Sequence, residues 1–393
     1  MILTRRAFAT GTLGAVGLAA LGERGSAALA APKSPVTINV IDVAGNLALT
    51  RPALDAYKAA KPNFVSAMTF TQSPAPELPA KIKAQQNANR VEIDLVLTGT
   101  DALAAGVEQG LWTELLPAHA KDLPALDAIY LPAAAKMQTL ARGEGVVVTY
   151  YPSGPLLEYM PDAVKTPPKT AAELLAWAKA NSGRFMYARP ANSGPGRTFL
   201  MGLPYILGDK DPMDPKAGWD KTWAYLEALG QTIDYYPSGT GATMKELGEG
   251  SRDMIATTTG WDINPRVLGI VPKEAKVAAL EGMHWVADAH YMCVPKGVDD
   301  EKLAVLLDLM GFMLEPKNQA FAYDKGYFYP GPAVKNVPLS MAPKESQEAL
   351  AEYGRPEYAS MIEAHPIDLP LSAEAMVLAF KMWDERIGGS KRR

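Results

Sequence analysis

The sequence predicts an α/β protein made of two lobes with a ligand cleft between them. Its 393 residues are enough for two domains, and its 48% hydrophobic content is ordinary for a folded chain. Segments typical of strands alternate with segments typical of helices along most of the chain. This alternation predicts two α/β lobes with largely parallel sheets.

Residues 1–30 have the pattern of an export signal. Arg5 and Arg6 precede Phe8 and an apolar stretch diluted by glycines, and a small-residue cleavage pattern ends at Ala30. The apolar stretch is shorter than the ~20 residues that span a bilayer, which argues against a membrane anchor. The paired arginines predict export by the twin-arginine (Tat) machinery, and therefore a periplasmic protein.

The first lobe begins with two strand–helix units. A strand over residues 36–43 is followed by Asn46 and a helix. A strand over residues 92–97 leads through Thr100 into a helix whose first turn contains Asp101. Both units place polar residues at the point where a strand ends and a helix begins.

Two β-like runs divide the chain into lobes. The run over 144–151 is followed by a proline-rich segment rather than an amphipathic helix, which indicates a crossover into a second lobe. The run over 284–295 precedes an amphipathic helix and indicates the return. We therefore expect residues 31–150 and 290–393 in the first lobe and residues 151–289 in the second.

The second lobe repeats the pattern of turns at helix starts. Its turns are expected to present Asn192, Ser193 and Gly194, followed by Arg197, and then Thr240; Tyr151 lies in the crossover, and Trp261 and Asp262 follow a strand. Ligands of open α/β sheets bind beyond the carboxyl ends of strands, where such turns meet helix N-termini. The turns of the two lobes would then face each other across a cleft.

Composition argues against several classes of function. Cys293 is the only cysteine and there are four histidines, so neither a disulfide nor a metal motif is expected. The net charge is −4 and the basic residues are not clustered, which argues against nucleic-acid binding. No nucleophile elbow, zinc-protease motif or phosphate loop is present, so we expect no catalytic residues and no cofactor. We assign His284 and His290 to strand packing.

The order of these features resembles the periplasmic solute-binding proteins of ABC importers, in the group with polyamine-, thiamine- and iron-binding members. The resemblance rests on "EIDLVLTGTDAL", "GVVVTYYPSGPLLEY", "GRFMYARPANSGPGRTFL" and "GEGSRDMIATTTGWD". It implies a type II periplasmic-binding-protein fold that closes on its ligand by hinge motion. It also implies a monomer that captures a small molecule and delivers it to an ABC permease in the inner membrane. An exported enzyme is the alternative class.

The class of ligand is open at this stage. Trp261, Asp262 and Tyr151 favour an organic cation such as a polyamine or thiamine-like compound, and this is our preferred prediction. Arg189 and Arg197 beside a helix start favour a phosphorylated or carboxylated metabolite. On the preferred prediction, substitution of Trp261 or Asp262 weakens binding more than substitution of Arg197. Iron is disfavoured, because the sequence has "TTTGWD" where the iron-binding members carry paired tyrosines.

Overall fold

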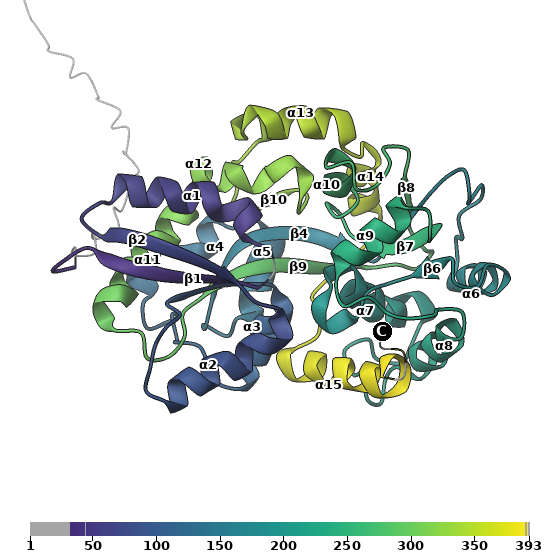
Figure 1. Ribbon diagram of the computed structural model, residues 1–393, viewed down its shortest axis with the longest axis horizontal. Helices are drawn as coiled ribbons and strands as arrows, with labels where there is room; N and C mark the ends of the chain where they lie inside the picture. The colour runs from purple at the N-terminus through teal and green to yellow at the C-terminus, as the bar shows by residue number, and fades with distance from the viewer. Residues whose placement is uncertain (1–31, 44, 390, 392–393) are drawn as a thin grey trace, which may run out of the picture.

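The computed structural model describes residues 32–43, 45–389 and 391. The expected export signal, residues 1–30, lies outside the described residues. Figure 1 shows an elongated molecule in which two α/β halves meet along a pair of long strands. Within the described ranges, no helix combines the length and apolar character needed to cross a membrane.

The first lobe is built on a sheet with the strand order β10-β4-β9-β3-β1-β2, and β11 pairs with β9 outside this path. The strands are β1 (Val36–Asp42), β2 (Val65–Gln72), β3 (Leu95–Thr98), β4 (Val146–Gly154), β9 (Trp285–Cys293), β10 (Gly331–Pro332) and β11 (Ile367–Asp368). Strand β1 is parallel to β2 and β3, whereas β9 is antiparallel to both β3 and β4.

The second lobe has a smaller sheet in the order β6-β7-β5-β8. Its strands are β5 (Leu156–Tyr159), β6 (Phe185–Met186), β7 (Met254–Thr257) and β8 (Lys276–Ala278). Strand β5 is antiparallel to β7 and β8, and only β6 and β7 are parallel.

Both sheets are mixed, so the expectation of largely parallel sheets is wrong. The reason lies in the two crossings between lobes. Strand β4 runs into β5 and carries the chain into the second lobe, and β9 brings it back, so the two crossing strands must run in opposite directions. Figure 1 shows β4 and β9 side by side across the middle of the molecule.

Helices flank each sheet. Those of the first lobe are α1 (Leu47–Ala60), α2 (Leu78–Asn87), α3 (Thr100–Glu108), α4 (Leu126–Ile129), α5 (Pro132–Leu140), α11 (Asp300–Met313) and α12 (Pro316–Gln319). Those of the second lobe are α6 (Ala171–Ala180), α7 (Gly194–Leu207), α8 (Asp220–Gly230), α9 (Thr240–Gly248) and α10 (Ile263–Val267). Helices α1, α3, α7 and α9 begin at the glycine-containing turns that the sequence singles out.

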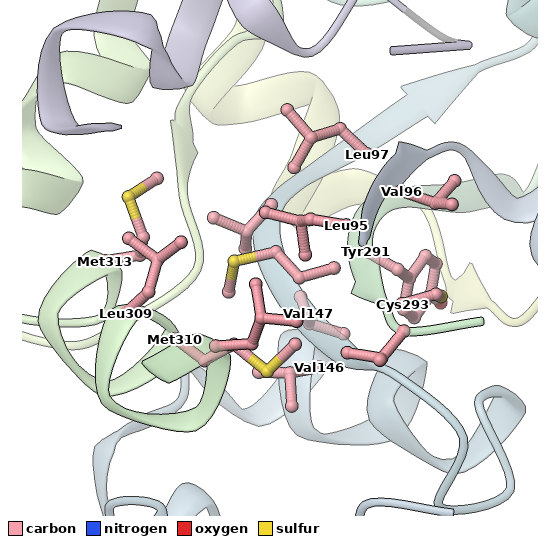
Figure 2. Close-up of a cluster of buried hydrophobic side chains, with 14 of the residues drawn as sticks. Leu95, Val96, Leu97, Val146, Val147, Tyr291, Cys293, Leu309, Met310 and Met313 are labelled. Carbon is pink, nitrogen blue, oxygen red and sulfur yellow. The ribbon is translucent and has the colours of Figure 1, made fainter. Parts of the chain in front are cut away.

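Each lobe has its own apolar core. Figure 2 shows the first core, where side chains of β3, β4 and β9 such as Leu95, Val147 and Tyr291 pack with Met310 of α11. Cys293 is buried in this core. The second core is centred on aromatic and aliphatic side chains of β6, α7 and α8. The two cores are distinct, although α3 of the first lobe contributes Ala104 to the second core.

The C-terminal helices are shared between the lobes. These are α13 (Lys344–Tyr353), α14 (Glu357–Ala364) and α15 (Ala373–Trp383). In α15, Trp383 packs in the second core, whereas Glu374 forms a two-point ion pair with Arg142 of the first lobe at 2.8 and 2.9 Å. Figure 1 shows α15 lying between α3 and α8. The expected assignment of all residues 290–393 to the first lobe is therefore not what the structure shows, because the apolar faces of these helices are covered from both sides.

Candidate functional site

A cavity of about 200 Å³ lies where the two lobes meet the crossing strands. It is lined from the first lobe by the turns before α1 and α3, from the second by the starts of α7 and α9, and from the crossing strands by Tyr151 and His290. Of the residues expected at the site, the following line the cavity: Asp101, Tyr151, Asn192, Ser193, Gly194, Arg197, Thr240 and Trp261. Asn46, Thr100 and Asp262 are not among the lining residues.

Four helix N-termini surround the cavity. Gly45, Gly99, Gly194 and Thr240 line it at or beside the starts of α1, α3, α7 and α9. Each N-terminus carries the positive end of a helix dipole, equivalent to roughly half a unit charge. The backbone thus creates a positive potential in the cavity before any side chain is considered.

Helices α7 and α9 also offer free backbone donors. The Ser193 hydroxyl caps α7 by accepting a hydrogen bond from the Gly196 N–H at 3.2 Å, and it lies 2.7 Å from the Thr240 hydroxyl. Within the described ranges, no hydrogen bond is found for the backbone N–H of Gly194, Thr240 or Gly241. Unpaired N–H groups at a helix start are suited to an oxyanion.

Arg197 is the centre of a group that we call the cleft cluster, formed by Arg197, Asp101 and Asp288. Its Nη1 lies 3.0 Å from Asp101 Oδ2, and its Nη2 donates to Asp288 Oδ2. Because Arg197 belongs to α7 and Asp101 to α3, their ion pair links the two lobes. The Arg197 side chain is only 5% exposed, compared with 11% for Asp101.

Asp288 of β9 anchors the cleft cluster. Its carboxylate accepts hydrogen bonds from Thr100 at 2.6 Å and from Tyr151 at 2.7 Å, in addition to that from Arg197. Burial by itself would raise the pKa of Asp288, but Arg197 and the two hydroxyl donors lower it below its usual value. Thr100 therefore acts on the site through Asp288, and Tyr151 both lines the cavity and holds this carboxylate.

Asp101 is the less firmly held carboxylate of the cleft cluster. Burial raises its pKa, and the nearby Arg197 offsets this only in part. Its Oδ1 accepts from the Ala102 N–H at 2.8 Å, within the first turn of α3. Its other oxygen, Oδ2, is paired with Arg197.

Aromatic side chains form one wall of the cavity. Tyr151 stacks on Phe328 with ring centroids 4.7 Å apart, and Trp261 lies 5.2 Å from the ring of Tyr327. The Tyr327 hydroxyl approaches Gly45 so closely that a Cβ there would lie 2.3 Å from it. Glycine at this position is therefore required both by the contact and by its φ of +74°.

Asn46 does not contact the cavity directly. It is fully buried, its Nδ2 lies 2.9 Å from His290 Nδ1, and its Oδ1 accepts a hydrogen bond from Thr50 at 2.7 Å. His290 does line the cavity. Asn46 thus reaches the site only through His290.

Asp262 is turned away from the cavity, contrary to the expectation from its position beside Trp261. It belongs to a group that we call the internal cluster, formed by Asp262, Arg266, Arg355, Tyr358 and Glu158. Asp262 accepts hydrogen bonds from Arg355 at 2.7 Å and Tyr358 at 2.5 Å, and its carboxylate lies 3.4 Å from Arg266. Burial raises the pKa of Glu158 well above its usual range. Asp262 has an exposed fraction of 0% and does not line the cavity.

Arg189 is also directed elsewhere. Its guanidinium donates to Asp384 and lies 5.2 Å from the ring of Trp383, so it ties the second lobe to the C-terminal segment. Of the two arginines named for an anionic ligand, only Arg197 lines the cavity.

The sequence analysis does not identify four residues of the site. His290, which it assigns to strand packing, lines the cavity, as do Tyr327 and Phe328, and Asp288 holds Arg197 and Tyr151 behind the lining. The alternation along β9 contained a usable signal, because Asp288 and His290 are polar residues two apart in an otherwise apolar strand and so share one face. In the described part of the chain, no three His, Cys, Asp or Glu side chains converge in a way that would hold a metal ion.

Two α/β lobes around a polar cavity, joined by crossing strands, define a cleft-type solute-binding protein. The chain belongs to the bacterial extracellular solute-binding protein family, whose profile matches residues 53–351. It is therefore an extracellular solute-binding protein, in agreement with the expected location outside the cytoplasm. No curated protein sequence matches the chain.

Solved structures share the fold over nearly the whole chain. The spermidine/putrescine ABC transporter substrate-binding protein PotD from Streptococcus pneumoniae has a TM-score of 0.59 at 14% identity, covering 88% of this chain and 99% of that one. AfuA from Actinobacillus pleuropneumoniae, with fructose-6-phosphate bound, has a TM-score of 0.62 at 16% identity, covering 90% and 99%. A periplasmic thiamin binding protein has a TM-score of 0.62 at 16% identity, covering 91% and 97%. At these identities the likeness confirms the type II fold and does not assign the ligand.

Proposed function

We propose that this protein captures a small solute with an anionic group, a carboxylate or a phosphate, and delivers it to the permease without chemical change. The observation that carries the proposal is the combination at the cavity of Arg197 with the unpaired N–H groups of Gly194, Thr240 and Gly241. The proposal includes the monomeric state and export by the Tat machinery, both of which rest on the sequence.

The balance of charge supports an anion over an organic cation. The prediction of a cation relied on Asp262 as the carboxylate beside Trp261. The carboxylate of Asp262 instead accepts hydrogen bonds from Arg355 and Tyr358 of the internal cluster. In the cleft cluster, Asp288 is saturated by donors from the protein. Among the described residues that line the cavity, Asp101 supplies the only carboxylate, and it faces the dipoles of four helices.

In this proposal the Asp101 carboxylate occupies the position on Arg197 that the anionic group of the ligand takes. It occupies one edge of the Arg197 guanidinium across the cleft at 3.0 Å, and its side chain retains some exposure. A carboxylate or phosphate entering the cavity replaces Asp101 on that edge and also receives the N–H groups of α7 and α9. The guanidinium of an arginine forms paired hydrogen bonds with a carboxylate or phosphate, whereas the ammonium group of a lysine does not.

An organic cation is the second candidate. The aromatic wall of Trp261, Tyr327 and Phe328 provides ring faces suited to an ammonium or aromatic cation, and Asp101 supplies a carboxylate nearby. A cation would bind the carboxylate of Asp101 in place of Arg197, and Arg197 would then be paired only with Asp288.

Isothermal titration calorimetry against a mixed panel separates the two candidates. The panel contains inorganic phosphate, fructose 6-phosphate and succinate as acids, and putrescine, spermidine and thiamin as amines. We expect binding to be confined to acids. Binding of an amine with no binding of any acid would overturn the proposal, and a turnover product after exhaustive repurification would overturn the absence of chemistry.

A further inference from the structure

A chain of three buried polar side chains leads from helix α1 to the cavity. Thr50, Asn46 and His290 have exposed fractions of 2%, 0% and 2%. The Thr50 hydroxyl lies 2.7 Å from Asn46 Oδ1 and 2.9 Å from the backbone carbonyl oxygen of Asn46, and Asn46 Nδ2 lies 2.9 Å from His290 Nδ1. Asn46 is itself held in place by its backbone N–H, which donates to Asp42 at 2.9 Å.

These hydrogen bonds fix which nitrogen of the His290 imidazole carries the proton. The Thr50 hydroxyl proton is shared between the backbone carbonyl and the nearer Oδ1 of Asn46, which turns the amide oxygen toward Thr50 and the amide nitrogen toward His290. The amide nitrogen can only donate, so His290 Nδ1 must accept and is unprotonated. A neutral imidazole with an unprotonated Nδ1 carries its hydrogen on Nε2.

The surroundings keep His290 neutral. Burial lowers its pKa to about 4; the nearby Asp288 opposes this and Arg197 adds to it. These two charged groups of the cleft cluster are the ones that face the ring. The remaining neighbours are aromatic: Phe328 lies edge to face at 4.4 Å and Tyr151 at 6.5 Å.

Nε2 is the ring nitrogen left for the cavity. His290 lines the cavity and its Nδ1 is taken by Asn46, and over the described part of the chain no hydrogen bond to Nε2 is found. We infer that Thr50 and Asn46 are positioning residues that present the Nε2–H of neutral His290 to the cavity as a fixed donor. Resting on the proposed function, this assigns a second subsite, which takes an uncharged or anionic oxygen acceptor of the solute.

The second subsite is separate from the oxyanion position. Tyr151 is near both, since its hydroxyl donates to Asp288 of the cleft cluster and its ring centroid lies 6.5 Å from that of His290. The solute would therefore carry a carboxylate or phosphate at Arg197 and a further oxygen, such as a carbonyl, ether or hydroxyl group, at His290. An ammonium or N–H group is excluded at this second position, because two donors would face each other.

Nitrogen NMR of the imidazole rings tests the tautomer in the ligand-free protein. The chain has only four histidines, so a His290→Gln variant assigns the signal. At pH 7 we expect His290 to show a protonated-type shift at Nε2 and an unprotonated-type shift at Nδ1. The reverse pattern, or an imidazolium, would overturn the inference.

Two variants test the relay of hydrogen bonds that runs from Thr50 through Asn46 to His290. Asn46→Asp replaces the donor by an acceptor of the same shape, so we expect the proton to move to Nδ1 or both nitrogens to be protonated. Thr50→Val leaves the amide unoriented and should give a mixture of the two tautomers, which provides a readout if Asn46→Asp does not fold. Unchanged shifts in the folded variants would contradict the relay.

Binding tests the subsite with a conservative rescue. For fructose 6-phosphate, which has oxygens beyond its phosphate, we expect His290→Leu to weaken binding about tenfold and His290→Gln, which keeps a donor, to remain within about threefold of the natural protein. Equal affinity of the His290→Leu variant and the natural protein for fructose 6-phosphate would refute the subsite. If no acid binds at all, the proposed function fails while the nitrogen shifts still decide the tautomer.

Discussion

The cleft cluster and the internal cluster are both buried groups of arginine and carboxylate side chains in or beside the second lobe, yet they have different surroundings. In the internal cluster, Asp262 is fully buried and its oxygens are satisfied by Arg355, Tyr358 and the Gly260 N–H. In the cleft cluster, Arg197 lines a cavity and Asp101 is partly exposed.

The difference shows that a buried ion pair does not by itself mark a ligand site. What distinguishes the cleft cluster is an open volume next to it and backbone donors that no protein group satisfies. The internal cluster holds the segment between α13 and α14 onto the second lobe, because Arg355 also donates to Ala275 at 2.7 Å and Arg266 to Tyr353 at 2.6 Å. We therefore expect its loss to affect stability, and loss of the cleft cluster to affect binding.

The largest effect is expected at the internal cluster. Asp262→Asn leaves two buried guanidinium groups without their carboxylate and should lower the free energy of unfolding by about 3–5 kcal/mol. Urea denaturation followed by tryptophan fluorescence measures this change. At a temperature where the variant is folded, affinity for a panel acid should stay within about threefold. A large loss of affinity with little loss of stability would break the comparison.

The next largest effect is expected at Arg197. Arg197→Gln removes a charge-assisted contact to the solute and should weaken binding of a panel acid about a hundredfold, or about 2.7 kcal/mol. Calorimetry provides the measurement. Arg189→Gln is the matched control, because Arg189 lies on Asp384 and Trp383 rather than at the cavity. Equal losses in the two variants would show that the effect is general rather than local.

A pH dependence of stability is expected from His290 beside the cleft cluster. Its pKa is about 4 in the folded protein, against about 6.5 for an unperturbed histidine, so the unfolded chain binds more protons between these values. Stability from this residue is therefore full above pH 6.5 and is lost as the pH falls toward 4, by up to about 1.4 kcal/mol per pH unit. The slope is measured as the natural protein minus His290→Gln, and identical slopes would contradict burial of a neutral imidazole.

The smallest effect is expected at the surface pair between Arg142 and Glu374. Both side chains are about half exposed, at 50% and 55%, although their geometry is two-pronged. Arg142→Gln should change the free energy of unfolding by less than about 1 kcal/mol, and salt should reduce the difference further. Thermal denaturation at low and high salt measures it. A loss comparable to that of Asp262→Asn would mean that burial does not explain the large effect expected at the internal cluster.

Much of the fold was predictable from the sequence because it depends on local signals. Turns with glycine and polar residues mark the starts of α3, α7 and α9, and the two β-like runs mark the crossings β4 and β9. The directions of the crossing strands were not predictable from hydrophobic periodicity, which carries no information on strand polarity. The shared position of α15 likewise depends on tertiary packing, since its apolar face meets both lobes.

The site was predictable where it is made by helix starts and unpredictable where it depends on side-chain direction. Trp261 and Asp262 are neighbours in sequence, but at the start of α10 one lines the cavity and the other enters the internal cluster. His290 gave no motif, because its role depends on Asn46, which lies 244 positions away in sequence. Such long-range pairs are set by the sheet, in which β1 and β9 flank β3.

The sign of the affinity change in Asp101→Asn tests the central claim most directly. The variant keeps the shape of the side chain and an oxygen that accepts from the Ala102 N–H, while removing the negative charge that competes for Arg197. Calorimetry with a panel acid should show binding about tenfold tighter than in the natural protein. Weaker acid binding in this variant, or an amine that binds the natural protein and is lost on Asp101→Asn, would contradict the assignment of an anionic solute.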